Sequence, residues 1–157
     1  MLEVTATAVL PVPPEQLWEL ISDTDRYPEW VQGTDAVTRT DGPTAPGSTY
    51  DEVNPVIGPW KARTHWTVVE HDAPRRQVHT SADLPLVSRL DIVMVSDPHP
   101  AGTSFALTFR AVPSHGPVGA ACAGLMRPRI ARDNRRTVEQ LTRLFSGPAA
   151  WRLPPSL

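Results

Sequence analysis

The sequence predicts an α+β domain in which a curved, seven-stranded antiparallel sheet wraps around one long C-terminal helix, with two short helices after the first strand. Residues 2–10 alternate between apolar and polar, residues 35–112 hold six more strand-like runs, and residues 117–145 change to a helical period. A curved sheet needs something to fill its concave face, and the long helix is the only element large enough. What that helix leaves unfilled is expected to be a cavity.

The first strand ends at Pro13-Pro14, and Pro14 suits the first turn of a helix. The apolar residues of 17–21 then predict a short amphipathic helix. A second helical turn is expected to run through Tyr27 and Trp30. The N-terminal part of the chain is therefore read as one strand followed by two short helices.

Turn-forming residues divide the middle of the chain into short segments. Signals such as Asp41-Gly42-Pro43 and the stretch from Asp97 to Gly102 punctuate it. No connection is long enough for a crossover helix, so the strands should form an antiparallel meander. The predicted strands lie near residues 35–40, 48–54, 60–70, 76–82, 86–96 and 103–112.

The long helix contains Pro128, which removes one backbone hydrogen bond and crowds the carbonyl of Gly124. A kink or break is therefore expected near 124–128. Gly147-Pro148 should end the helix. Residues 1–146 are predicted to form a single domain, and residues 147–157 a C-terminal tail.

Composition narrows the function. The 157 residues carry a formal net charge of -2, which gives no reason to expect nucleic acid as a partner. No apolar run approaches the roughly 20 residues of a membrane span, so no stable membrane insertion is expected. Glu3 lies where a secretory signal would be positively charged, which favours a cytoplasmic location.

Neither a metal nor another cofactor is predicted. Cys122 is the only cysteine, which makes a cysteine-based metal site very improbable. The five histidines fall on strand positions and turns that are expected to be exposed, and no two have the spacing of helical metal ligands.

Strand alternation predicts which side chains face the helix. Over 60–68 the even positions should point inward, because the odd positions are mostly charged or polar. The same reasoning selects residues from the three later strands. The predicted inward set is Trp60, Ala62, Thr64, Trp66, Val68, Val78, Thr80, Leu90, Ile92, Met94, Phe105, Leu107 and Phe109.

The helix presents an apolar stripe that includes Met126, Ile130 and Leu141. Asn134 falls inside this stripe. A buried amide without partners costs about 1–3 kcal/mol, so something should hydrogen-bond to it. Two partners remain open: a backbone group or water, and the polar end of a ligand.

The strand at 48–54 places Tyr50, Glu52 and Asn54 on one face. If that face points inward, the cavity gains a phenol, a carboxyl group and an amide, although Val53 argues for the opposite orientation. A carboxyl group in an apolar pocket can act as a general acid or base. The candidate catalytic residues are therefore Glu52, Tyr50 and Asn134.

Four segments resemble the polyketide cyclase/dehydrase and lipid-transport family of the START and birch-pollen-allergen (SRPBCC) superfamily. These segments are Val12–Trp18, Asp23–Trp30, Pro46–Tyr50 and Val68–Arg76, and the Tyr-Pro-Glu-Trp part of the second is the most specific. The resemblance covers about residues 3–146. It implies the helix-grip fold and a hydrophobic pocket, but no single reaction, because the family includes cyclases, aromatases and lipid carriers.

Three functions are weighed. The first is binding of a small hydrophobic molecule of polyketide, lipid or isoprenoid type. The alternative is an enzyme, a cyclase/aromatase or dehydratase, that works by acid–base chemistry in the same cavity. The third is a role as a protein-interaction module. The chain is expected to be a monomer or a homodimer. The residues expected to contact the ligand are Trp60, Thr64, Trp66, Met94, Phe105, Phe109, Met126, Ile130 and Asn134.

Overall fold

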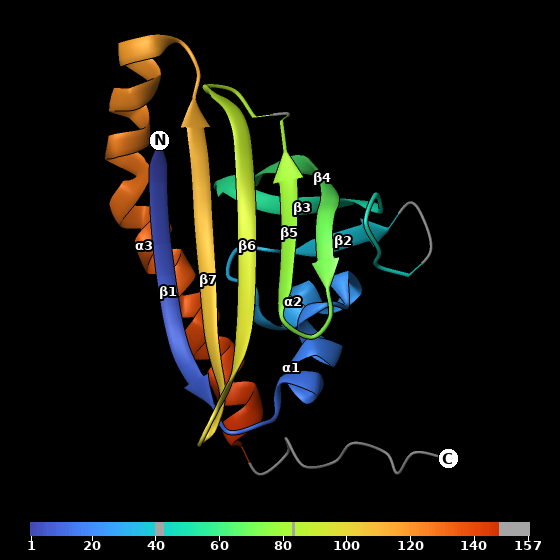
Figure 1. Cartoon of the computed structure of the whole chain (residues 1–157). Coiled ribbons are helices and arrows are strands. Elements are labelled where there is room, and N and C mark those ends of the chain that lie inside the picture. Colours follow the sequence, from blue (N-terminus) through green and yellow to red (C-terminus); the bar gives the residue numbers. More distant parts are fainter. Residues whose placement is uncertain (40–42, 83, 148–157) are drawn as a thin grey trace.

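The computed structural model describes residues 1–39, 43–82 and 84–147. The N-terminal elements are β1 (Leu2–Leu10), α1 (Pro14–Ile21), the single-turn 3-10 helix η1 (Thr24–Arg26) and α2 (Tyr27–Trp30). The other strands are β2 (Ala36–Arg39), β3 (Thr49–Ile57), β4 (Trp60–Asp72), β5 (Arg76–Ser81), β6 (Val87–His99) and β7 (Gly102–Pro113). Helix α3 (Gly116–Ser146) completes the order (Figure 1).

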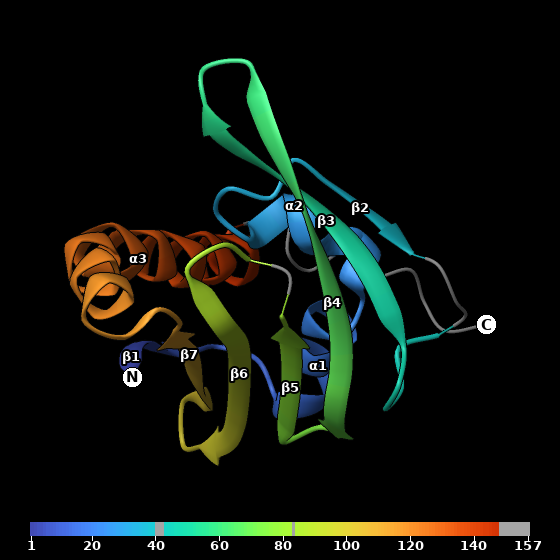
Figure 2. The same cartoon turned by 90° about the horizontal axis from the view of Figure 1, so that it is seen from above.

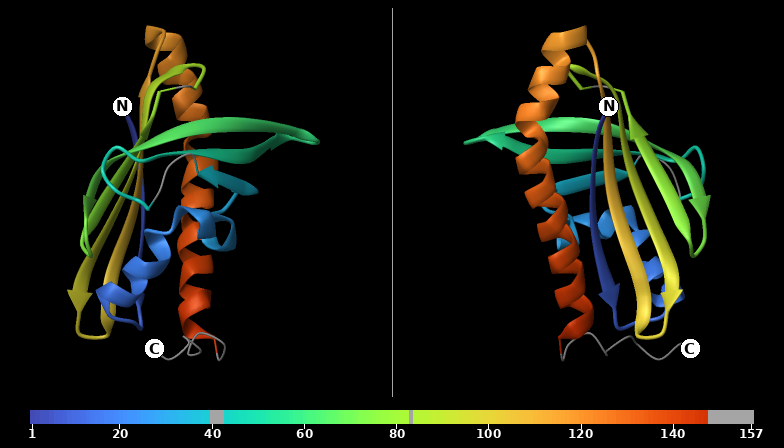
Figure 3. Two further views of the ribbon diagram at one scale, coloured as in Figure 1. Left: turned by 90° about the vertical axis from the view of Figure 1, so that its right-hand side faces the viewer. Right: turned by 60° about the vertical axis from the view of Figure 1, so that its left-hand side comes forward.

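The seven strands form one antiparallel sheet in the order β1-β7-β6-β5-β4-β3-β2. The first strand of the chain therefore lies beside the last, and β1 and β2 are the two edges. The sheet bends strongly, so that β3 and β4 run across the direction of β1 and β7 (Figure 3). Helix α3 packs against β1, β7 and α2. The predicted fold class is confirmed.

Strand β6 runs through Pro98 to His99, where the sequence predicts a turn. Its pairing with β5 ends at Val95, and from there only β7 lies beside it. A proline has no backbone N–H to donate and is tolerated where a strand has a free edge. The strand therefore continues three residues, to His99, beyond the point where its turn-like composition begins.

Helix α3 continues across Pro128 without a break. Gly124, whose carbonyl oxygen loses its hydrogen bond to residue 128, is exposed. Water can therefore replace the missing backbone bond, which explains why the proline does not end the helix. No described helix is both long and apolar enough to cross a membrane. Of the predicted tail, 147–157, residues 148–157 lie outside the described residues, as do residues 41 and 42 of a predicted turn.

Strand β5 is oriented opposite to the prediction. Its inward residues are Gln77, His79 and Ser81, and His79 pairs across the sheet with the inward residue Ile92. Val78, expected inward, lies on the other face and is also buried. Because the outward residue Val78 and the inward residue His79 are both buried, burial of an apolar residue does not mark the inward face of β5, and the prediction for Val78 and Thr80 is wrong.

Candidate functional site

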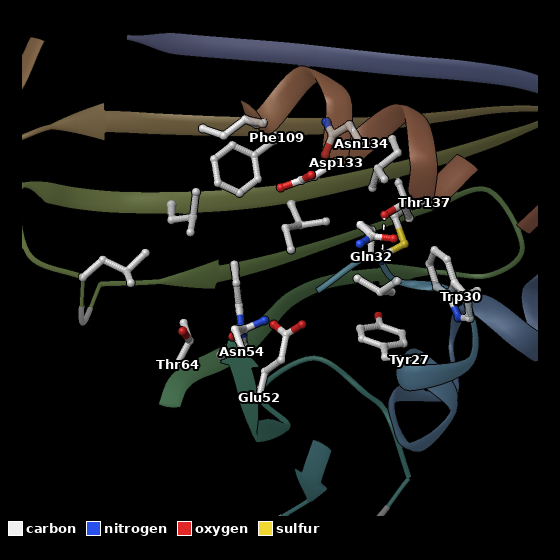
Figure 4. A pocket seen from close by; sticks show the side chains of 18 of the residues that line it. Tyr27, Trp30, Gln32, Glu52, Asn54, Thr64, Phe109, Asp133, Asn134 and Thr137 are labelled. Carbon is white, nitrogen blue, oxygen red and sulfur yellow. Dashed lines mark hydrogen bonds between the residues drawn. The ribbon is translucent and has the colours of Figure 1, made fainter. Parts of the chain in front are cut away.

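A cavity of about 330 Å³ lies between the concave face of the sheet and helix α3 (Figure 4). Strands β3, β4, β6 and β7 supply its wall on one side, α3 supplies the other, and α2 with the segment after it borders one end. The volume lies at the small end of the roughly 300–1,000 Å³ typical of ligand pockets. The space therefore suits a compact ligand.

Most of the cavity wall is apolar. Ile92 and Met94 on β6 and Leu107 and Phe109 on β7 point from the sheet toward Ile130 on α3. Alternation along each strand brings every second side chain to this face. Because the two neighbouring strands turn their apolar side chains to the same face of the sheet, these side chains form one continuous surface.

Polar groups gather around the cavity from two directions. Glu52 and Asn54 come from β3 and Thr64 from β4, whereas Asp133 and Asn134 come from α3 (Figure 4). Glu52 is 6 % exposed, and the hydroxyl group of Thr34 donates a hydrogen bond to its Oε1. The inward orientation of the Glu52 face therefore holds despite Val53.

Asn134 finds a backbone partner. Its Nδ2 donates to the carbonyl oxygen of Val4 at 3.1 Å, and the side chain also lines the cavity. Val4 lies in the edge strand β1, whose carbonyl groups have a neighbouring strand on one side only. Of the two partners left open by the sequence, the structure provides the backbone one.

A hydrogen bond closes the end of the cavity near α2. The backbone N–H of Gln32 donates to Thr137 Oγ1 at 2.9 Å, which joins the segment after α2 to α3. Nearby, Gln140 Nε2 donates to the carbonyl oxygen of Glu29 at 3.0 Å. Trp30, which is fully buried, also lines the cavity. These two bonds fix the position of α2 against the helix.

A buried polar chain lies under the same end of the sheet. Gln77 Nε2 donates to the carbonyl oxygen of Ile21 at 2.8 Å, so its Oε1 is the atom that accepts from His79 Nε2 at 3.3 Å. His79 Nδ1 then carries no hydrogen and accepts the hydroxyl hydrogen of Tyr50 at 2.7 Å. Burial lowers the pKa of His79 from 6.5 to about 3, with a smaller contribution from His71. The imidazole is therefore neutral.

Tyr50 is part of this chain and does not line the cavity. Burial, together with Tyr27 and Glu52, raises its pKa well above the ordinary 10. Its hydroxyl group is held by His79, so Tyr50 links β3 to β5, and its catalytic role stays a prediction. His79, which was expected to be exposed, is fully buried.

The structure places three of the expected ligand contacts elsewhere. Trp60 is 76 % exposed at the end of the β3–β4 hairpin, which extends away from the rest of the sheet (Figure 2). Met126 is 45 % exposed and belongs to the part of α3 between Gly119 and Asn134, in which no residue is buried. Phe105 is fully buried near the start of β7, at the end of the sheet where α1 packs.

The other expected residues are brought together. The ones that line the cavity are Glu52, Thr64, Trp66, Met94, Phe109, Ile130 and Asn134. The lining residues that were not predicted from the sequence are Tyr27, Trp30, Val31, Gln32, Leu84 and Asp133. Gln32 and Leu84 lie between regular elements, where no periodicity exists to orient them, and Asp133 sits at the margin of the helical stripe.

Similar solved structures define the class of fold. Protein TTHA0849 from Thermus thermophilus matches with a TM-score of 0.72 and 19 % identity, over 90 % of this chain and 94 % of that one. Ara h 8.0201 matches with a TM-score of 0.67 and 11 % identity, over 89 % and 97 %. The di-domain ARO/CYC StfQ of the steffimycin biosynthetic pathway matches with 0.75 and 11 %, over 94 % of this chain but only 51 % of that chain. The fold is the helix-grip fold.

The family model for polyketide cyclase / dehydrase and lipid transport matches residues 1–146. The chain therefore belongs to that family, and the resemblance noted in the sequence is confirmed. A search of curated proteins found no match.

The buried His79 should make stability depend on pH. Its folded pKa of about 3 lies below the ordinary 6.5, so protonation favours the unfolded chain, and the stabilisation present above pH 6.5 is lost as the pH falls. Between pH 7 and pH 5 the wild type should lose about 2 kcal/mol more than the His79→Gln variant, measured by urea denaturation. An equal loss in both proteins would contradict a neutral, buried His79.

Replacing Asn134 should weaken the attachment of α3 to β1. The Asn134→Leu variant leaves the Val4 carbonyl oxygen without its donor, so the free energy of unfolding should fall by about 1–3 kcal/mol in urea titrations. Gln140→Leu is the matched control, because Gln140 makes the same kind of bond from the same helix at an exposed position. A loss no larger than that of the control would argue against a structural role for the Asn134 bond.

Proposed function

We propose that this protein binds a small hydrophobic molecule of polyketide, lipid or isoprenoid type in the cavity between the sheet and α3. The observation that carries the proposal is the continuous apolar wall made by β6, β7 and Ile130 around about 330 Å³ of space. Apolar cavities hold water poorly and take up apolar molecules. Filling this one would bury apolar surface at about 25 cal/mol per Å².

Membership of the polyketide cyclase / dehydrase and lipid transport family supports the same proposal. The polar residues Glu52, Thr64 and Asn134 give the cavity a chemically distinct region. Pockets of this kind use a large apolar surface for affinity and a few polar groups for orientation. The expected ligand is therefore mostly apolar and carries at least one polar group.

Filling the cavity from its wall tests the proposal. In Ala62→Trp the new indole should occupy ligand space, so the affinity for Nile red, an uncharged hydrophobic dye, should fall about tenfold or more in a fluorescence titration. Arg63→Trp is the matched control, because Arg63 is the next residue of β4 and faces the opposite side. Equal affinities in both variants, or no binding by the wild type, would contradict the proposal.

The second candidate function is that of a cyclase or dehydratase, and the position of the Glu52 carboxyl group favours it. This carboxyl group is buried, faces the cavity and rests on a regular strand, and only its Oε1 is engaged by Thr34. Its other oxygen, Oε2, would take a proton from the carbon next to a carbonyl group of the substrate, as a general base does. StfQ, a di-domain ARO/CYC of similar fold, adds a precedent by analogy only.

Glu52→Gln separates the two functions. If the protein is such an enzyme, the variant should lose at least about a hundredfold in turnover of a polyketide-like substrate, since an amide cannot accept the proton. Binding of Nile red should persist, because shape and apolar wall are unchanged. Full turnover in the variant would exclude Glu52 as the base, and absence of turnover in the wild type would leave binding as the function.

A further inference from the structure

The polar groups of the cavity point to its ligand class. We propose that the cavity selects molecules whose polar end donates hydrogen bonds, above all a protonated amine and then a hydroxyl group, and discriminates against carboxylates such as fatty acids. This inference rests on the proposed binding function and deepens it.

The charged side chains of the cavity are all acidic. Among the described residues that line it, Glu52 and Asp133 carry carboxyl groups, and none is lysine, arginine or histidine. A ligand carboxylate would therefore enter a space with like charge and no cation to pair with, and burying an unpaired charge is strongly unfavourable.

Glu52 is the centre of this selectivity. No ion pair involves Glu52 within the part of the chain that the structure describes, and its single protein donor is the hydroxyl group of Thr34, which uses Oε1. Its register partners on the neighbouring strands are Val37 and Thr64, neither of which is charged. Among the described residues, the second oxygen of this 6 % exposed carboxyl group thus has no donor, and a donor on the ligand would satisfy it.

Asp133 contributes less. Its two carboxyl oxygens lie 3.8 Å from Arg129 Nε and 3.6 Å from Arg132 Nε, and its side chain is 35 % exposed. The two arginines lie on the same helix and offset its charge before a ligand arrives. The carboxyl group without a cationic partner is therefore Glu52.

Two uncharged polar groups, those of Asn134 and Thr64, add to the same preference, whereas the indole N–H groups of the lining residues Trp30 and Trp66 are donors that are themselves buried and without a partner among the described residues. Asn134 donates an N–H group to the Val4 carbonyl oxygen, and its own side-chain carbonyl oxygen remains available to accept a hydrogen bond. Thr64, 6 % exposed, lines the cavity and takes part in no side-chain hydrogen bond with another described residue. Its hydroxyl group can accept a hydrogen bond as well as donate one. An ammonium group, which only donates, matches such surroundings with charge-assisted bonds.

Three probes with one tail test the preference. Octylamine (protonated near neutral pH), octanol and octanoate should each displace Nile red from the wild type. Octylamine should bind about tenfold or more tightly than octanoate, and the affinity of octanol should lie between those two. Octanoate binding as tightly as octylamine, or three equal affinities, would overturn the inference while leaving the proposed function intact. If Nile red itself does not bind, the proposed function fails first.

The Glu52→Gln variant locates the preference. It keeps the shape of the side chain but removes its charge, so the ratio of octylamine to octanoate affinity should fall to near one while Nile red still binds. Asp51→Asn is the matched control, because Asp51 is the preceding residue of β3, faces outward and pairs with His65 at 2.7 Å. Its ratio should equal that of the wild type. A preference that survives in Glu52→Gln, or disappears in Asp51→Asn, would contradict the assignment to Glu52.

Discussion

Helix α3 is held along one edge of the sheet, and the cavity exists because of where this contact lies. Val138, Leu141 and Phe145 are buried in the core, and Asn134 donates to the edge strand β1. The helix packs on β1 and β7, while the sheet bends so that β3 and β4 cross over the same side (Figure 3). One helix cannot fill a concave surface of that width, and the unfilled part is bordered by β3, β4, β6 and β7.

The two ends of the concave face differ in how fully side chains fill them. Near α1 and α2 the space is filled, and the chain of Tyr50, His79 and Gln77 uses hydrogen bonds in place of apolar packing. Each member has its partner, so burial carries little penalty and the chain fixes β3 and β5 relative to Ile21. Further along the sheet, Glu52 and Thr64 face open space. The side chains of Tyr50, His79 and Gln77 thus all have hydrogen-bond partners, whereas Glu52 at the cavity uses only one of its two oxygens.

The sequence predicted the elements well because each depends on a local signal. Alternation marked the strands, turn residues separated them, and the apolar stripe marked α3. Parity located the inward faces of β4, β6 and β7, since one face of each is predominantly apolar. It failed for β5, where Val78 and His79 are both buried. Strand alternation and the helical stripe predict which face a residue lies on, but not how far the facing strand or helix extends. Trp60 and Met126 were therefore placed at the cavity, although both side chains are exposed.

Glu52 links the two proposed functions through one physical requirement. Its carboxyl group is held by β3 and by Thr34, so its position is set before any ligand enters. A bound molecule that displaces water from the cavity must then supply the donor that water would have supplied, or leave an oxygen unpaired at a cost of about 1–3 kcal/mol. A carrier meets this requirement with a hydroxyl or ammonium group of the ligand. A cyclase meets it with the acidic C–H of the substrate, which becomes a proton donor only during the reaction. The difference between carrying and converting a ligand therefore lies in which atom of that ligand reaches Oε2.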